Sequence, residues 1–72
     1  MRGGHEDPES ATGRLGQVTT AIAGGAHPGE IRVAIRGGSE MFIAYSDTPV
    51  ERGASVLVTE DLGGRAVRVV AG

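Results

Sequence analysis

The sequence of 72 residues has no cysteine and, among its seven basic residues, no lysine. Without cysteine it can form neither a disulfide framework nor a thiolate zinc site, so nothing in it indicates an oxidising compartment. Without lysine it lacks the residue that a Walker phosphate-binding loop requires and the residue that a lipoyl or biotinyl carrier domain modifies. These two classes are excluded, and we expect no cofactor.

Long hydrophobic runs are also missing. No stretch reaches the roughly 18 consecutive apolar residues that a membrane-spanning helix needs. The start of the chain, residues 1–7, lacks the apolar core of a secretory signal. The sequence therefore predicts a cytoplasmic protein with no direct membrane span, peripheral to a membrane only through a partner.

A basic surplus is missing as well, since seven arginines face nine acidic residues and give a formal net charge of −2. Proteins that bind nucleic acid usually carry a basic surplus, because phosphate neutralisation and counterion release supply most of their affinity. The balance here disfavours nucleic acid as a partner. The exclusive use of arginine is typical of the coding bias of a GC-rich bacterial genome.

Residues 1–12 combine glycine, proline and acidic side chains with almost no large apolar group. Such a segment cannot bury enough surface to offset the entropy that it loses on ordering. We therefore expect residues 1–12 to form a flexible acidic tail and residues 13–72 to form one small domain.

Five apolar segments of strand length occur in this domain, and turn residues separate them. They cover residues 14–22, 30–36, 40–47, 54–61 and 65–71. Gly16 within the first segment indicates a bulge or bend, and Val50 is expected to plug one end of the fold. Five strands and no long helix predict an all-β protein, a small five-stranded Greek-key barrel of the OB type, with an SH3-like barrel as the alternative.

The second segment alternates with a period of two, which sends Ile31, Val33 and Ile35 to the core. Gly37-Gly38 after it indicates a two-residue hairpin turn, and Leu62-Gly63-Gly64 indicates another hairpin. The third segment is apolar on both faces, so its alternation does not settle which side chains point inward.

Several glycine and aliphatic spacings occur together in a fixed order along the chain. They are Gly13-x-x-Gly16-x-Val18, Gly29-x-Ile31-x-Val33, Phe42-x-Ala44-x-Ser46 and Val50-x-x-Gly53-x-x-Val56-x-Val58. Their order and distances resemble the C-terminal OB-fold domain of NfeD-like membrane proteins. In that family the barrel normally follows transmembrane helices and, in long members, a Ser-Lys serine protease domain. This sequence contains neither, so we expect a free-standing barrel to which no proteolytic residue can be transferred.

The resemblance implies a protein-interaction module that works with a membrane scaffold protein of the flotillin (SPFH) type or with an NfeD-like homologue. It also implies that Phe42 and Ala44 point inward. Met41, Ile43 and Tyr45 would then face outward as an apolar stripe, which an isolated small barrel is not expected to leave exposed.

The predicted protein-binding surface consists of this stripe together with Leu57, and Arg32 and Arg36 rim it. A register shifted by one residue would instead place the stripe in the core. An incompletely closed barrel would also leave a strand edge, so homo-oligomerisation by edge pairing is a further prediction.

No catalytic site is predicted. A serine hydrolase needs a nucleophile, a base and an orienting acid, and Ser39 and Ser46 are the candidate nucleophiles. His27 and Asp47 are the candidate partners. Met41 stands where a nucleophile elbow after Ser39 requires glycine, and the strand-to-helix turn of that motif is absent. We therefore expect a protein that is not an enzyme.

No metal site is predicted either. His5 and His27 do not form a ligand pair at regular spacing. The acidic residues at positions 6, 7 and 9 lack the turn glycine and the spacing of a calcium loop.

Binding of single-stranded nucleic acid is the alternative function, because OB barrels often stack bases on aromatic side chains above a basic groove. The platform available for it is Tyr45 with Arg32, Arg36 and Arg68.

Overall fold

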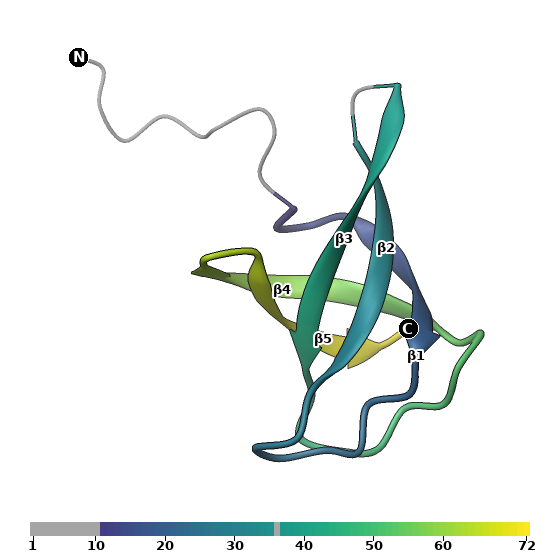
Figure 1. The fold of residues 1–72 in the computed structure, drawn as a ribbon, viewed down its shortest axis with the longest axis vertical. Helices are drawn as coiled ribbons and strands as arrows, with labels where there is room; N and C mark the ends of the chain where they lie inside the picture. Colours follow the sequence, from purple (N-terminus) through teal and green to yellow (C-terminus); the bar gives the residue numbers. More distant parts are fainter. Residues whose placement is uncertain (1–10, 36) are drawn as a thin grey trace.

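The computed structural model describes residues 11–35 and 37–72, and these residues form five β-strands and no helix (Figure 1). The strands are β1 (Leu15–Thr20), β2 (Gly29–Ile35), β3 (Gly38–Tyr45), β4 (Ser55–Gly63) and β5 (Ala66–Ala71). Each strand overlaps one of the five predicted segments, so the predicted all-β class is confirmed. The predicted tail lies outside the described residues up to position 10.

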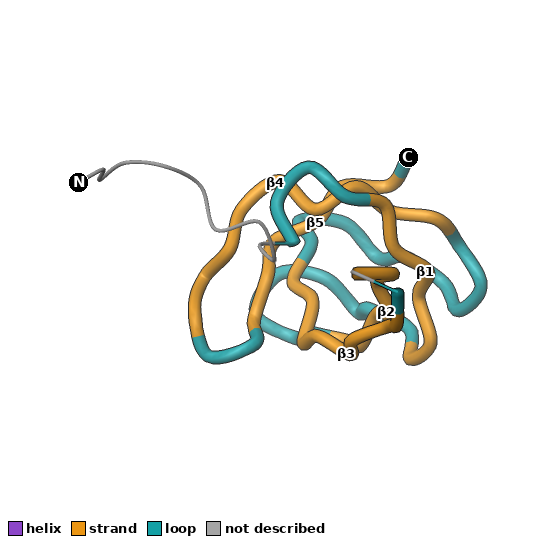
Figure 2. The backbone as a smooth tube through the Cα atoms, turned by 90° about the horizontal axis from the view of Figure 1, so that it is seen from above, coloured by secondary structure: helices purple, strands orange, loops and turns teal. Residues whose placement is uncertain are grey.

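The five strands close into a barrel in the order β1-β2-β3-β5-β4, around a central interior (Figure 2). β3 and β5 pair in parallel, and the other four pairings are antiparallel. With β5 inserted between β3 and β4, this is the Greek-key order of the predicted OB-type barrel and not the SH3-like alternative. The ring of pairings is closed, so the prediction of an incompletely closed barrel is wrong.

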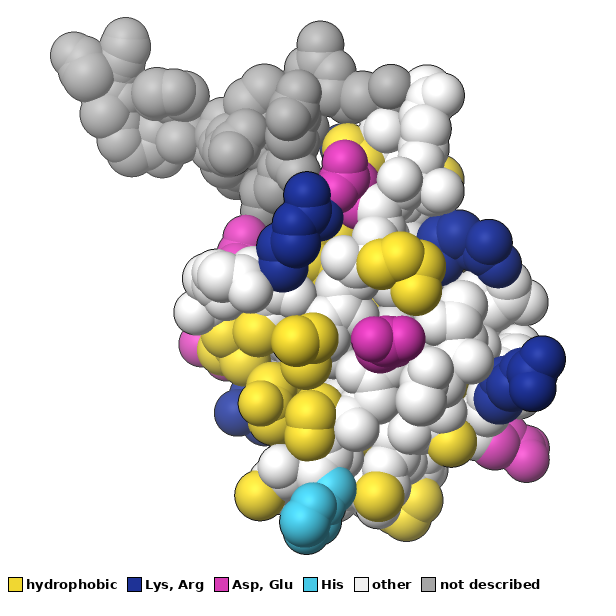
Figure 3. Space-filling view, viewed as in Figure 1, with side chains coloured by type: hydrophobic (Ala, Val, Ile, Leu, Met, Phe, Trp, Pro, Cys, Tyr) yellow, Lys and Arg dark blue, Asp and Glu magenta, His cyan; other side chains and the backbone are white. Residues whose placement is uncertain are grey.

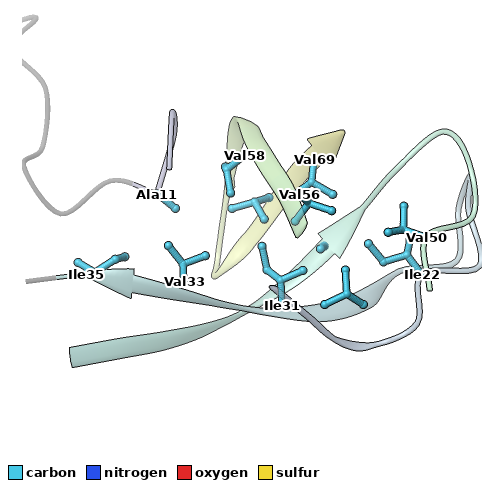
Figure 4. Packing of buried hydrophobic residues seen from close by; sticks show 12 residues of the cluster. Ala11, Ile22, Ile31, Val33, Ile35, Val50, Val56, Val58 and Val69 are labelled. Carbon is cyan, nitrogen blue, oxygen red and sulfur yellow. The ribbon is translucent and has the colours of Figure 1, made fainter. Parts of the chain in front are cut away.

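The interior is filled by aliphatic side chains that point inward from alternate positions of the strands. The largest fully buried residues are Ile22, Ile31, Val18, Val33, Val56, Val58, Val67 and Val69 (Figure 4). Ile31, Val33 and Ile35 are all buried, as the alternation predicts. Because the barrel is small, β-branched side chains fill it without long or aromatic ones.

Residues outside the strands close the two ends of the barrel. At one end Ile22 and Val50 are buried and exchange two backbone hydrogen bonds, with N···O distances of 2.8 and 2.9 Å. The predicted plug by Val50 is confirmed. At the opposite end, near Ile35, Ala11 is only 1% exposed (Figure 4). Ala11 was predicted to belong to the tail, and its burial shows that this prediction is wrong. No apolar neighbour in the sequence signals that this small side chain is buried at the barrel end.

Gly16 does not form the predicted bulge. It pairs with Val33 on β2 in regular register, and the irregularity of β1 falls between Val18 and Thr20. A Cβ atom at Gly16 would lie 3.1 Å from side-chain carbons of Ile31 and Val33. Glycine therefore suits the close packing of β1 against β2, where a larger residue would press on β2.

Gly38, which was predicted to lie in the first hairpin turn, belongs to β3 instead. It pairs with Ile35 at the end of β2. Ser39 does not extend the turn, because it pairs with Ala34 on β2.

The second hairpin turn is one residue later than predicted. Gly63 pairs with Ala66, so Gly64 and Arg65 form the turn, with φ angles of 61° and 63°. Positive φ at both central residues is the geometry of a type I′ turn, which matches the twist of the flanking strands. The sequence did not indicate Arg65 as a turn residue, because arginine is uncommon at positive φ.

Candidate functional site

The outer face of β3 carries the predicted apolar stripe. Ala44 is fully buried and Phe42 is half-buried against the core, so the predicted inward pair is confirmed. Met41 and Ile43 therefore point outward and are 44% and 42% exposed, and Tyr45 is half-buried. The register shifted by one residue is wrong. We call Met41, Ile43 and Tyr45 the β3 patch.

Strand β2 gives one border of the β3 patch a pair of opposite charges. Arg32 lies directly opposite Met41, and Glu30 lies directly opposite Ile43. The carboxylate Oε1 of Glu30 accepts a hydrogen bond from Oγ1 of Thr20 at 3.2 Å. Side chains directly opposite each other on one face of a sheet are in contact distance. The apolar surface is therefore bordered here by one cation and one anion.

Strand β5 forms the other border of the patch. Ala66 lies beside Ile43 and Arg68 lies beside Tyr45. In Figure 3, hydrophobic side chains gather along the β3–β5 side of the face shown, and an acidic side chain stands at their border. Ala66 extends the apolar surface across the strand boundary, and Arg68 ends it.

Arg68 is flanked by two carboxylates. Its Nη1 lies 3.7 Å from Oδ1 of Asp47, and its Nε lies 3.6 Å from Oε1 of Glu60. All three side chains are largely exposed, so each ion pair contributes little to stability. Two anions close to one guanidinium nevertheless lower the positive potential at this position.

The structure does not bring Leu57 to the β3 patch. Because β5 lies between β3 and β4, Leu57 is opposite Leu15 on β1 and opposite Val70 on β5. Leu15 is 66% exposed and Val70 is 47% exposed. We call Leu15, Leu57 and Val70 the leucine row. Alternation from the buried Val18 and Val69 indicates that Leu15 and Val70 face outward, but only the register shows that they flank Leu57.

The rim predicted for the patch is half described. Arg32 lies next to Met41, as stated above, whereas Arg36 lies outside the described residues. The platform predicted for single-stranded nucleic acid is reduced accordingly to Tyr45, Arg32 and Arg68 on adjacent strands.

Ser46, one of the two candidate nucleophiles, has a structural role. It is 3% exposed, and its Oγ accepts a hydrogen bond from the backbone N–H of Thr48 at 3.3 Å. Its carbonyl oxygen accepts a second bond from the N–H of Gly25 at 2.8 Å. The first bond shapes the loop after β3, and the second ties this loop to the loop between β1 and β2. Ser39, the other candidate, is exposed on β3.

The described residues contain neither a metal-binding cluster nor a membrane-spanning helix. Between positions 11 and 72, with 36 left aside, no three His, Cys, Asp or Glu side chains are grouped so that they could hold a metal ion. Over the same residues no helix has the length and apolar character needed to cross a bilayer.

The strand order and the outward apolar patch define the protein as an OB-type barrel domain. Residues 15–70 match the family of the NfeD C-terminal domain, and the chain belongs to this family. The resemblance inferred from the glycine and aliphatic spacings is confirmed. None of the curated proteins is similar enough to count as a match.

Two experimentally known structures are similar to the barrel. The C-terminal domain of the stomatin operon partner protein 1510-C from Pyrococcus horikoshii is 28% identical, with a TM-score of 0.69 over 94% of this chain and 97% of that one. The soluble domain of the NfeD protein YuaF from Bacillus subtilis is 29% identical, with a TM-score of 0.68 over 82% of this chain and 70% of that one.

Proposed function

We propose that this domain is a protein-docking module that catalyses no reaction and that binds a membrane scaffold protein of the stomatin and flotillin (SPFH) type through the β3 patch. The domain would act in the cytoplasm and reach the membrane through this partner. The observation that carries the proposal is the exposure of Met41 and Ile43, 44% and 42%, at alternate positions of one strand.

The composition of the patch supports protein recognition. Single exposed apolar residues are ordinary on a protein surface, whereas a contiguous group with a polar rim is typical of an interaction site. Met41, Ile43 and Tyr45 form such a group, and Arg32 and Glu30 lie at its β2 border. The apolar centre would supply affinity, and the two opposite charges would orient the partner.

The similarity to the Pyrococcus protein supports the class of partner. That protein is described as a stomatin operon partner, and its C-terminal domain is similar to this chain along almost the whole length of both. A stomatin-type protein is therefore the first partner to test for this chain.

The charges around the patch argue against the nucleic-acid alternative. Arg68 stands near Asp47 and Glu60, and Glu30 lies beside Ile43 at the centre of the patch. A phosphate backbone approaching this face would meet three carboxylates near two guanidinium groups, Arg32 and Arg68. Since phosphate contacts dominate affinity for nucleic acid, this arrangement favours a polypeptide.

The test is the affinity of the purified domain for the stomatin-type protein of the same organism, held in detergent micelles. The double variant Met41→Ser and Ile43→Ser should bind at least ~10-fold more weakly, because each substitution removes an apolar anchor. The matched control is the double variant Leu15→Ser and Val70→Ser, which changes the leucine row elsewhere on the barrel. The control should bind within about twofold of the original chain, an effect of under ~0.5 kcal/mol.

Two results would contradict the proposal. One is equal affinity of the original chain and the β3-patch variant for the stomatin-type protein. The other is salt-sensitive micromolar binding of a labelled single-stranded oligonucleotide that Arg68→Gln weakens, which would support the nucleic-acid function.

A further inference from the structure

Among the described residues, no other strand covers one edge of the first half of β3. The N–H of Ile43 donates to the carbonyl oxygen of Arg65 at 2.9 Å, so the main-chain groups of Ile43 point toward β5. Main-chain groups two residues apart in a strand point to the same edge. The N–H and C=O groups of Met41 and Ser39 therefore point to the β5 side as well.

Strand β5 does not reach these groups. Its first pair with β3 is Ala66 opposite Ile43, and the pairing continues only toward Tyr45. Before Ala66 the chain turns away through Gly64 and Arg65 into the β4–β5 hairpin, which diverges from the β2–β3 hairpin (Figure 1). Within residues 11–35 and 37–72, no backbone hydrogen bond to Met41 or Ser39 from that side is present.

The other edge of the same residues is fully used. Hydrogen-bonded and non-hydrogen-bonded pairs alternate along an antiparallel ladder. Since Ile43 points toward β5, the pairs of Phe42 with Ile31 and of Glu40 with Val33 are the hydrogen-bonded ones. The uncovered groups of Ser39 and Met41 are therefore not needed to hold β3 against β2.

We propose that this uncovered edge accepts an extended segment of the protein partner as an added strand, hydrogen-bonded to the main chain of Ser39 and Met41. The inference rests on the proposed function and specifies how the partner is held. The added strand would continue the line of β5 on the N-terminal side of Ala66, next to the side chain of Met41 in the β3 patch. Four main-chain groups in a row specify an extended chain, which is the mode of β-strand addition.

A second copy of this chain fits the edge poorly. Antiparallel pairing of two identical edges that uses both residues places Ser39 opposite Met41 of the other copy, and it therefore places Glu40 opposite Glu40. Like charges directly opposite each other in a sheet are destabilising. The exposed contact of each Glu40 with its own Arg65 offsets only part of this repulsion. A partner segment with an uncharged residue at this position avoids the repulsion altogether, so the charges favour a different chain.

The ion pair between Arg65 and Glu40 marks the start of the site. The guanidinium Nη1 of Arg65 contacts Oε1 of Glu40, which links the two hairpins next to the uncovered edge. The two side chains are 64% and 44% exposed, so water surrounds this link. The edge available to a partner is therefore short, and the neighbouring apolar surface of Met41 and Ile43 would supply most of the affinity.

A proline at position 39 tests the main-chain hydrogen bonds to the partner separately from the side-chain contacts. Ser39→Pro removes one N–H from the uncovered edge and none from the ladder with β2, which is the position where strands tolerate proline. Ser39→Ala is the matched control, because it removes the hydroxyl and keeps the N–H. Glu40→Pro removes a ladder hydrogen bond and should lower the melting temperature clearly, which checks the assignment of the two edges.

We expect Ser39→Pro to melt at nearly the same temperature as Ser39→Ala and to bind the stomatin-type protein at least ~3-fold more weakly, because one main-chain hydrogen bond to the partner is lost. In the unsubstituted chain, hydrogen exchange should show fast-exchanging amides at Ser39 and Met41 that become protected in the complex. The amides of Glu40 and Phe42 should be protected in both states.

Equal binding by Ser39→Pro and Ser39→Ala, or unchanged exchange at Met41 in the complex, would overturn the inference. So would a dimer of the original chain that Ser39→Pro converts to a monomer, since the occupant would then be a second copy. Protection of Met41 in the free chain that disappears on deletion of residues 1–10 would assign the edge to the chain's own tail. Loss of binding in the Met41→Ser, Ile43→Ser variant without any effect of proline leaves the proposed function standing and refutes only the added strand.

Discussion

Ile31 and Ile43 lie on adjacent strands, one register position apart, and they have opposite surroundings. Ile31 points into the barrel and is 0% exposed, whereas Ile43 points outward and is 42% exposed. The same side chain therefore fills the core at one position and lies on the exposed outer surface at the other. The direction of the residue in the strand decides between the two roles, and the residue type does not.

The largest expected effect on stability is at Gly29, a buried residue of β2. A Cβ atom there would lie 2.2 Å from the carbonyl oxygen of Thr20 and 2.5 Å from that of Ala21. Both are backbone atoms, which cannot move aside as a flexible side chain would. Gly29→Ala should destabilise the domain by at least about 4 kcal/mol, enough to unfold a domain of this size, as measured by urea titration.

Gly38→Ala is the control for this prediction. The nearest atom to a Cβ at Gly38 is the carbonyl oxygen of Ile35 at 4.0 Å, and the residue is exposed at the start of β3. The free energy of unfolding should change by less than about 1 kcal/mol. Similar losses of stability for Gly29→Ala and Gly38→Ala would mean that interior crowding does not set the requirement for glycine.

The second prediction compares the two isoleucines directly. Ile31→Ala leaves a cavity in the packed core, so it should cost about 3 kcal/mol of unfolding free energy. Ile43→Ala removes a partly exposed side chain and should cost less than about 1 kcal/mol. Urea titrations of both variants measure the difference, and equal costs would refute the assignment of Ile43 to the outer face.

The sequence predicted the inner face of the barrel better than the outer one. The period of two in the second strand identified Ile31 and Val33 as core residues, because every second residue of a strand points to the same face. The third strand is apolar on both faces, and only the family resemblance placed Ala44 inward. Ala11 was missed because its burial depends on the shape of the barrel end and on no local pattern.

The outer surface could be predicted only residue by residue. The outward direction of Met41 was predicted from the family resemblance, and Leu57 was predicted to join it, but their distance from each other depends on which strand lies between them. The position of β5 between β3 and β4 separates them and joins Leu57 to Leu15 and Val70 instead. This order results from the Greek-key topology, which a single strand's sequence does not contain. The edge left by β5 at Ser39 was unpredictable for the same reason.

The smallest predicted effect on stability is at Arg65, whose backbone has φ 63° and whose side chain contacts Glu40. Two substitutions there distinguish the cost of backbone strain from the contribution of the ion pair. Arg65→Ala loses an exposed ion pair and keeps a side chain at positive φ, so it should be destabilised by about 0.5 kcal/mol. Arg65→Gly loses the same ion pair but relieves roughly 1 kcal/mol of left-handed strain. The glycine variant should therefore be more stable than the alanine variant by about 1 kcal/mol in urea titration. Equal stability of the two variants would show that the turn adapts to an L-residue without strain, and the arginine would then need no compensation from its contact with Glu40.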